Sequence, residues 1–214
     1  MKQFMICMIM CWFFACDQLP KISDPKGSIS IKIPRGIPNK IFFKDSTVLV
    51  YSVKMVIDSV QFYTENGDSI QLFYGPELVS LDSATNFIKA AEFKIPEGTY
   101  SHASFLVRPP TPSEMITDTA FFERTPPSMV ITGRSDTLNF YQKVGGRLLL
   151  KQQLIDPLTV IAGSVTNITF FLDTRLWFPD GYLPYGIKET GKLEKDILNS
   201  LDVFADNNGD GVMD

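Results

Sequence analysis

The chain has 214 residues, 44% of them hydrophobic, and its 20 Lys and Arg residues against 24 Asp and Glu residues give a formal net charge of −4. No run of basic residues occurs, so we do not expect a nucleic-acid partner, because binding to a phosphate backbone depends on clustered Lys and Arg. All three cysteines, Cys7, Cys11 and Cys16, precede residue 17. The rest of the chain therefore has no disulfide, catalytic cysteine or cysteine-ligated metal.

Residues 1–15 have the pattern of a secretion signal. Lys2 is followed by an apolar run from Phe4 to Ala15. As a helix this run would rise about 18 Å, which is short of the roughly 30 Å hydrocarbon layer of a bilayer. The pattern predicts a cleaved signal peptide rather than a transmembrane helix.

The end of this segment, Phe13-Phe14-Ala15-Cys16, resembles the lipobox of bacterial lipoproteins. In that family, signal peptidase II cuts directly before a cysteine whose thiol has been diacylated. Phe14 departs from the pattern, which usually has a small residue at that position. The resemblance implies a covalent lipid on Cys16 and an extracytoplasmic location in the cell envelope, anchored to the outer or the inner membrane. The alternative is an ordinary secretory signal that is cut elsewhere.

Residues 16–27 are predicted to be the lipidated cysteine and a polar tether that contains Pro20. Beyond the tether, many segments alternate apolar with polar side chains or are rich in β-branched and aromatic residues, as half-buried strands are. These segments are residues 28–33, 47–63, 69–74, 77–82, 100–107, 128–132, 147–153, 158–162 and 167–173. In residues 47–63 the apolar alternation shifts phase between Ile57 and Val60, which predicts a bulge or two strands. Residues 84–91 favour one or two helical turns.

Turns separate these segments at short intervals. Glu65-Asn66-Gly67-Asp68 is typical of a hairpin turn, and Pro96-Glu97-Gly98 of a tight turn. Residues 109–127 contain Pro109, Pro110, Pro112, Pro126 and Pro127, which predicts a long loop or crossover. The pattern as a whole predicts an all-β fold, an antiparallel β-sandwich over residues 28–178.

Three segments are similar to a widespread family of uncharacterised bacterial lipoprotein domains built as Ig-like or transthyretin-like sandwiches. They are residues 56–63 with the following hairpin, residues 94–100, and residues 160–177, where Phe171-Leu172-Asp173 and Trp177 match the end of a late strand. The resemblance covers about residues 28–178 and implies the sandwich fold. The family has no established catalytic residues, so it implies none here.

Residues 179–214 are expected to be a loop, a short helix and an Asp/Asn-rich tail. Leu193, Ile197 and Leu201 recur every four residues, the spacing of an amphipathic helix. In the tail, Asp206, Asn208, Asp210 and Asp214 have the spacing of oxygen ligands in a calcium loop. Gly211 is at the turn, and the Val212 carbonyl would be a further ligand. The acid at the twelfth position of a complete EF-hand is missing, so we expect weak Ca²⁺ binding, about 10⁻⁴ to 10⁻³ M. The alternative is a solvated polar tail.

An aromatic cluster and a single histidine are two further candidate sites. Trp177, Tyr182 and Tyr185, with Phe178, follow the last sandwich strand; they predict either a sugar-stacking platform or an apolar lid over the end of the sandwich. His102 is the only histidine and lies in a predicted strand, without a G-x-S-x-G motif anywhere in the chain. We interpret it as structural.

These observations favour a membrane-anchored, extracytoplasmic lipoprotein with a non-catalytic binding or structural role. Its partners would be the membrane, through the lipid, and a glycan or protein at the cell surface. One alternative is a surface adhesin or glycan-binding module, which joint exposure of Trp177, Tyr182 and Tyr185 would favour. Another is a hydrolase or an accessory subunit of an enzyme complex, which a polar cluster around His102 in a deep pocket would favour.

Overall fold

The computed structural model of the chain describes residues 26–32, 41–43, 46–82, 87–135, 137–178 and 190–206, together with Asn208 and Met213. The predicted signal peptide, Cys16 and most of the predicted tether lie outside the described residues. None of the helices within these ranges is long and apolar enough to cross a bilayer.

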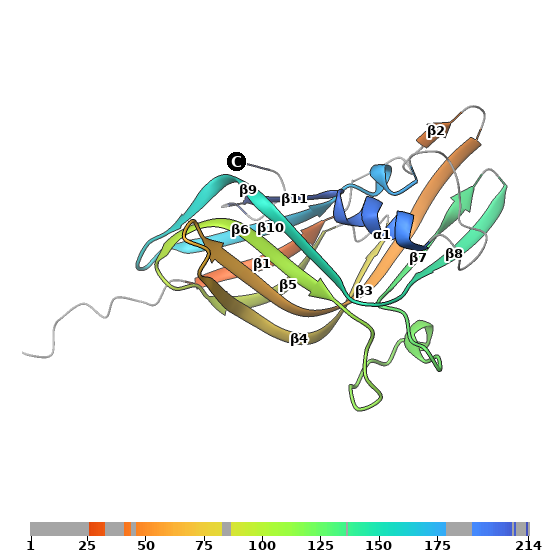
Figure 1. Ribbon diagram of the computed structural model, residues 1–214, viewed down its shortest axis with the longest axis horizontal. Helices are drawn as coiled ribbons and strands as arrows, with labels where there is room; N and C mark the ends of the chain where they lie inside the picture. The colour runs from red at the N-terminus through yellow and green to blue at the C-terminus, as the bar shows by residue number, and fades with distance from the viewer. Residues whose placement is uncertain are drawn as a thin grey trace, which may run out of the picture.

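Strands account for most of the described ranges (Figure 1). They are β1 (Lys26–Lys32), β2 (Ile41–Phe43), β3 (Ser46–Thr64), β4 (Ser69–Asp82), β5 (Phe87–Lys94), β6 (Gly98–Val107), β7 (Met129–Ser135), β8 (Leu138–Val144), β9 (Leu148–Val160), β10 (Val165–Leu172) and β11 (Leu201–Ala205). The helical elements are short, namely η2 (Thr119–Phe121), η3 (Thr174–Leu176) and α1 (Thr190–Leu198). This arrangement confirms the predicted all-β, sandwich-like fold with a short C-terminal helix.

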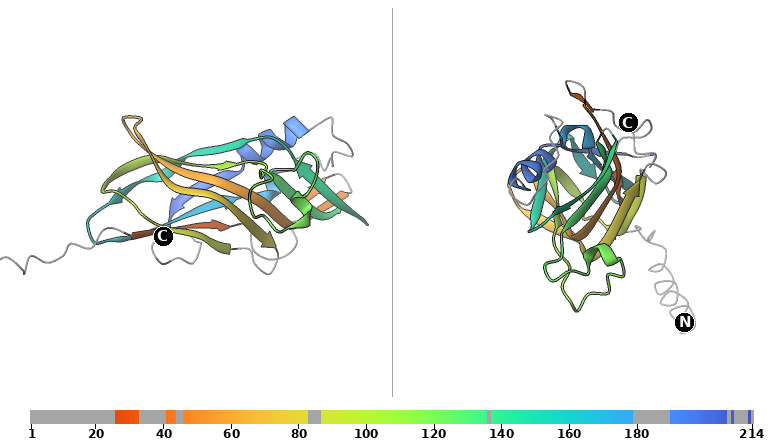
Figure 2. Two further views of the ribbon diagram at one scale, coloured as in Figure 1. Left: turned by 90° about the horizontal axis from the view of Figure 1, so that it is seen from below. Right: turned by 90° about the vertical axis from the view of Figure 1, so that its right-hand side faces the viewer.

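The strands form two sheets around one core (Figure 2). A four-stranded sheet has the order β11-β10-β1-β5, and a seven-stranded sheet contains the path β8-β7-β3-β6-β9, with β2 and β4 also paired to β3. Paired strands are antiparallel except β1 and β10, which run parallel. Phe105 of β6 and Phe170 of β10 meet between the sheets edge to face, with ring centroids 5.1 Å apart. Both side chains are buried, so the main core lies between the two sheets.

The central strand of the larger sheet is β3, which is 19 residues long. Its register shifts between Ile57 and Ser59 in the pairing with both β4 and β6. The phase shift in the sequence is therefore a β-bulge inside a single strand, with Asp58 as the extra residue. Gly75 of β4 lies opposite, where an added Cβ would be 2.2 Å from the Ile57 carbonyl oxygen. This close approach of two backbones requires glycine.

The predicted turns are present, and two pairs of predicted strands are continuous. Residues 65–68 connect β3 to β4, with Gly67 at a φ of 89°. The turn before Gly98 connects β5 to β6. The predicted segments 69–74 and 77–82 both belong to β4, and the segments 147–153 and 158–162 fall mainly within β9.

The helical turns predicted for residues 84–91 are wrong where the structure describes that segment. Phe87 starts β5, which pairs antiparallel with β1 at the edge of the four-stranded sheet. Backbone pairing along β1 outweighs the weak local preference of this segment for helix.

The C-terminal helix is shorter than its spacing predicted. Leu193 and Ile197 of α1 are buried against the main core, as expected for one face of a helix. Leu201 is the first residue of β11 instead and pairs with Leu172 of β10. The predicted boundary at residue 178 therefore does not divide the structure, because β11 completes the same sheet.

Candidate functional site

The segment between β6 and β7, here named the β6–β7 loop, folds back over the outer face of the seven-stranded sheet (Figures 1 and 2). Met55 and Ile57 of β3 face the main core, so Val56 between them faces outward. Val56 packs there against buried loop side chains, and Val130 of β7 completes the contact. We name this group the outer cluster; its buried members are Val56, Ile116, Phe121 and Val130. The loop thus has a small core of its own, on the opposite side of the sheet from the main core.

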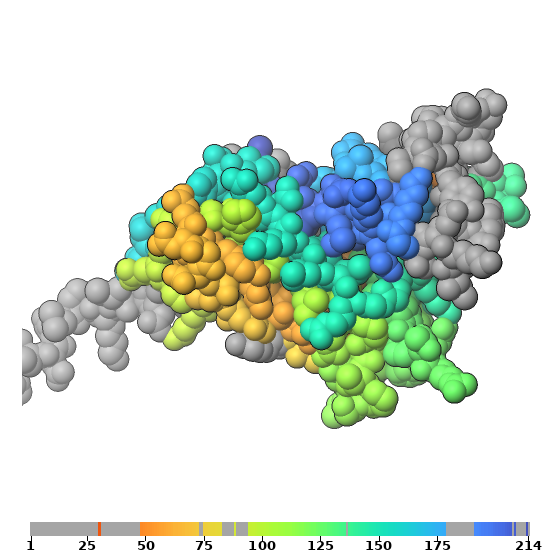
Figure 3. Space-filling model, in the orientation of Figure 1, coloured from red at the N-terminus to blue at the C-terminus, as the bar shows by residue number. Residues whose placement is uncertain are grey.

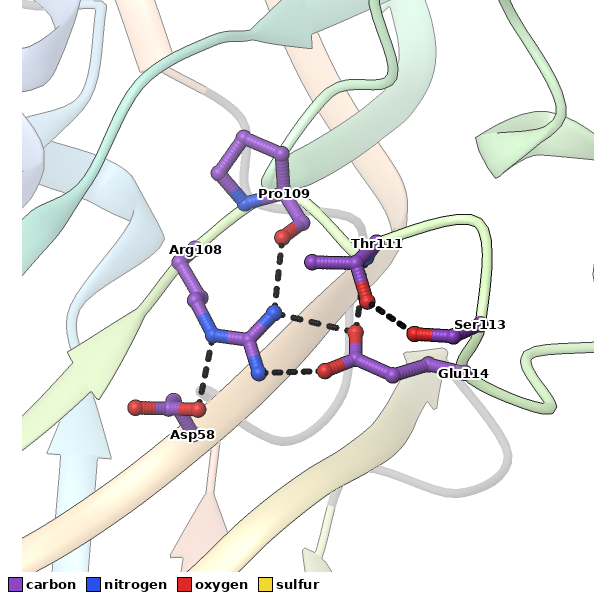
Figure 4. Close-up of polar contacts among 6 residues, drawn as sticks. All are labelled: Asp58, Arg108, Pro109, Thr111, Ser113 and Glu114. Atoms are coloured by element: carbon purple, nitrogen blue, oxygen red, sulfur yellow. Dashed lines mark hydrogen bonds and ion pairs between the residues drawn. The ribbon is translucent and has the colours of Figure 1, made fainter.

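Arg108 ties the start of the loop to both the sheet and the loop itself (Figure 4). Its Nε donates to Asp58 Oδ1 at 2.7 Å, so the bulge in β3 is what brings the acceptor into position. Its terminal nitrogens donate to the two carboxylate oxygens of Glu114 at 2.9 and 2.6 Å. Such a two-pronged pair fixes orientation as well as charge. Glu114 also accepts from the Thr111 backbone N–H at 2.7 Å, which closes the turn between them.

We name Asp58, Arg108 and Glu114 the Arg108 clamp; its hydrogen bonds shift the pKa values of Arg108 and Glu114. The hydrogen bonds from Arg108 lower the pKa of Glu114 to about 2, and partial burial, which opposes the shift, is the smaller effect. The hydrogen bond to Glu114 raises the pKa of Arg108 above its ordinary value. All three side chains are 16–25% exposed, so solvent screens the interaction only in part. Arg108 and Glu114 therefore both stay charged throughout the physiological pH range.

Two further ion pairs connect the loop to the sheet. Lys54 of β3 donates to Asp118 Oδ2 at 2.6 Å, and the other oxygen of Asp118 caps η2 by accepting from the Ala120 N–H. The hydrogen bond from Lys54 lowers the pKa of Asp118. Lys143 of β8 pairs with Glu123 near the surface. The loop is thus attached at its beginning, its middle and its end.

An open groove of about 560 Å³ lies between the two limbs of the loop. The loop projects from the body of the molecule, so the groove is open to solvent rather than enclosed (Figure 3). Prolines and phenylalanines contribute most of its apolar lining, which includes Pro109, Pro110, Pro112, Pro126, Phe121 and Phe122. Phe122 is 63% exposed, whereas its neighbour Phe121 is buried in the outer cluster. One aromatic side chain therefore anchors the groove and the next one is open to a ligand.

One of the aromatic residues predicted as a stacking platform is buried. Trp177 is 1% exposed, and its indole N–H donates to the Ser200 hydroxyl at 2.6 Å. Phe178 is also buried, and its ring meets Phe140 of β8. A stacking role for Trp177 is thus incorrect in this structure, because the ring belongs to the main core. Tyr182 and Tyr185 lie outside the described residues.

The predicted calcium ligands are described only in part. Asp206 is fully buried, and its Oδ2 accepts from the Thr169 hydroxyl at 2.8 Å while its N–H donates to the Asn167 carbonyl. Asn208 is exposed, and Asp210, Val212 and Asp214 lie outside the described residues. No metal-binding group of three His, Cys, Asp or Glu side chains occurs in the described part of the chain. Weak calcium binding by this tail stays a prediction.

His102 has a serine as its neighbour rather than a catalytic partner. Its Nδ1 lies 2.9 Å from the hydroxyl of Ser101, the residue next to it in β6. Within the described ranges no carboxylate is hydrogen-bonded to the ring, so a Ser/His/Asp relay is not assembled there.

The β6–β7 loop was predicted as a long Pro-rich loop, but not as a site. Its contacts with Asp58 and Lys54 join residues far apart in the sequence, which spacing alone does not reveal. One signal was available: Ile116, Phe121 and Phe122 are large apolar side chains within a predicted surface loop. Several large apolar side chains close together in one loop are typical of a buried contact or of a binding surface.

Comparison of the chain with protein-family models, with curated proteins and with solved structures gives no match. Inference about function therefore depends on the sequence motifs and on the geometry of the β6–β7 loop. That loop is the best candidate site in the described part of the chain, because it joins an ordered scaffold to an open groove.

Proposed function

We propose that the protein is a lipid-anchored, extracytoplasmic lipoprotein with a non-catalytic binding role, and that the β6–β7 loop is its binding surface. The lipobox-like Phe13-Phe14-Ala15-Cys16 and the preceding apolar run support the anchor. The loop supports the binding role, because binding residues commonly lie on loops held by a rigid β scaffold.

The observation that carries the binding role is the way the loop is built. A buried cluster and three ion pairs hold this loop against the sheet in one conformation. Here Phe121 and Ile116 are buried beneath the groove while Phe122 above them stays exposed. Holding a binding surface in one conformation before the ligand arrives reduces the entropy lost on binding.

The position of the loop relative to the tether also supports this function. Lys26 of β1 pairs with Val165 and Lys94, so the chain enters the sandwich at the end where the β5–β6 and β9–β10 turns lie. Strand β6 starts at that end with Gly98, opposite Val160. Its 10 residues span roughly 30 Å before the loop begins. The chain thus joins the sandwich at the opposite end of β6 from the start of the β6–β7 loop.

The anchor is tested by replacing the acylated cysteine in the full-length protein. In cells fed an alkyne-tagged fatty acid, the wild-type protein should take up the tag and partition into the detergent phase. Cys16→Ser should lose both properties, whereas the matched variant Cys11→Ser, within the signal, should keep them. Tag retained by Cys16→Ser would overturn the anchor.

The binding surface is tested by site-specific photo-crosslinking in intact cells. Met115 is 97% exposed on the β6–β7 loop, and Glu65 is an exposed residue of the β3–β4 turn. We expect p-benzoylphenylalanine at position 115 to give defined adducts by mass spectrometry, and the same residue at position 65 to give none. Equal adducts from both positions, or none from position 115, would contradict a binding role for the loop.

A further inference from the structure

The groove of the β6–β7 loop has walls that suit an apolar ligand. Four prolines line it, Pro109, Pro110, Pro112 and Pro126, and proline has no backbone N–H to donate. Phe121 and Phe122 add aromatic surface, with Phe122 largely exposed. A ligand body lying against these walls would find apolar contact and few hydrogen-bond donors.

Of the charged residues that line the groove, the two acids have basic partners and the arginine has no partner in the described ranges. Glu114 is already paired with Arg108 through both carboxylate oxygens. Glu123 is paired with Lys143. Arg124 is exposed, and its side chain makes no ion pair or hydrogen bond with any residue in the described ranges. Arg124 is therefore the charged lining side chain with no partner in the described ranges, an uncommitted guanidinium beside an apolar wall.

From this combination we infer that the groove binds a small amphiphilic anion, an apolar body with a single carboxylate or sulfonate, with Arg124 as the counter-ion. The inference rests on the proposed role of the β6–β7 loop as the binding surface. A guanidinium can donate two parallel hydrogen bonds to a carboxylate, which fixes the orientation of the ligand as well as its charge. The volume of about 560 Å³ is that of a small-molecule site, for which about 300–1,000 Å³ is usual.

The geometry also defines which ligands the groove would reject. A cationic ligand would meet the positive charge of Arg124, while Glu114 and Glu123 are each already paired with a basic side chain. A polar sugar would leave its hydroxyls unpaired against proline and phenylalanine. Apolar character and negative charge are thus both required.

A matched pair of probes tests the two requirements separately. Naphthylacetate and naphthylacetamide share one ring system and differ in the negative charge. With the chain from Asp17 onward, which keeps every described element, calorimetry should show the anion binding about tenfold more tightly than the amide, the gain expected for one charge-assisted hydrogen-bonded contact. The preference should shrink at high salt, because the counter-ion is exposed.

Three variants assign the effect to residues. Arg124→Gln should reduce binding of the anion to the level of the amide, while Arg147→Gln, at an exposed arginine outside the groove, should change neither. Phe122→Ala should weaken both probes by a similar factor, because it removes apolar contact but no charge. Competition against naphthylacetate by decanoate and by N-acetylphenylalanine shows which apolar group the groove prefers, an aliphatic chain or a peptide-type aromatic side chain.

The outcomes separate this inference from the proposed function. An unchanged preference for the anion in Arg124→Gln would overturn the assignment of the counter-ion. Absence of binding by both probes would overturn the inference as a whole. If crosslinked adducts still formed from position 115 in that case, the loop would remain a binding surface for a ligand of a different class.

Discussion

The main core and the outer cluster hold their parts of the molecule in different ways. The main core is continuous across both sheets and includes side chains from α1 and the segment around Trp177. The outer cluster has few buried side chains, and ion pairs supply most of its remaining attachments. A segment with little buried apolar area can open without unfolding the protein. The comparison therefore suggests that the fold and the binding surface have separate stabilities, which substitutions should distinguish.

The largest effect is expected in the main core. Phe105→Ala removes a ring that is 1% exposed and that meets Phe170 across the two sheets. The free energy of unfolding should fall by about 3–5 kcal/mol, through lost apolar burial and the cavity left behind. Urea denaturation measures this change, with Phe122→Ala as the exposed control at about 0.5 kcal/mol or less. Equal losses from the two variants would contradict a core that crosses the sheets at Phe105.

A smaller global effect is expected from the outer cluster. Phe121→Ala removes a ring of similar burial, but the loop can open locally, which limits the loss to about 2 kcal/mol. Hydrogen exchange should accelerate across residues 108–127 while β6 and β10 keep their protection. A uniform acceleration over the whole chain would show that the two cores form one cooperative unit.

The clamp around Arg108 should make the loop sensitive to acid. The pKa of Glu114 is lowered to about 2 from an ordinary value of 4.5, so its charge stabilises the loop above pH 4.5. This stabilisation is lost as the pH falls from 4.5 towards 2, because protonation removes the charge that Arg108 binds. Glu114→Gln should lower the stability of the loop at pH 7 by about 1 kcal/mol.

The measurement is hydrogen exchange of the loop at pH 6 and pH 3, corrected for the intrinsic rate. The wild-type loop should lose protection between the two values, and Glu114→Gln should lose less of it. Glu97→Gln, at an exposed acid in the β5–β6 turn, is the control. The same pH response in wild type and Glu114→Gln would assign the acid sensitivity to other groups.

Local sequence patterns predicted the positions of the strands better than they predicted which strands pair with one another. Alternation located most of β1, β3, β4, β6 and β10, and the phase shift near Asp58 marked a true bulge. Strand β11 was missed because Leu201 follows Ile197 by four residues and so extends a helical spacing into a strand. The parallel pairing of β1 with β10 joins the two ends of the sandwich sequence, which no local pattern encodes.

The candidate site was missed for a related reason. Asp58 and Arg108 are 50 residues apart, and Lys54 and Asp118 are 64 apart, so only the fold brings each pair together. Trp177 is a candidate for a ligand platform in the sequence because it belongs to an aromatic cluster directly after the last sandwich strand. In the structure its indole N–H donates to the Ser200 hydroxyl inside the core. Ser200 lies between α1 and β11, so its contact with Trp177 depends on how these two elements pack and cannot be predicted from the local sequence.

The smallest effect on stability is expected from substitution of Lys143. This variant tests most directly whether stability and ligand binding can be changed separately. Lys143 and Glu123 are 38% and 41% exposed, and ion pairs of that exposure contribute about 0–1 kcal/mol. Lys143→Gln should therefore leave the free energy of unfolding nearly unchanged.

The same variant should weaken binding by the groove. It leaves the Glu123 carboxylate without its partner beside Arg124, so that the acid offsets the positive charge offered to the ligand. Naphthylacetate should then bind severalfold more weakly, while naphthylacetamide should bind as before. The double variant Lys143→Gln, Glu123→Gln removes the acid as well and should restore affinity for the anion. A loss of stability above about 1 kcal/mol in Lys143→Gln would instead mean that β8 holds the loop in place, and that structure and binding are not separable at this edge.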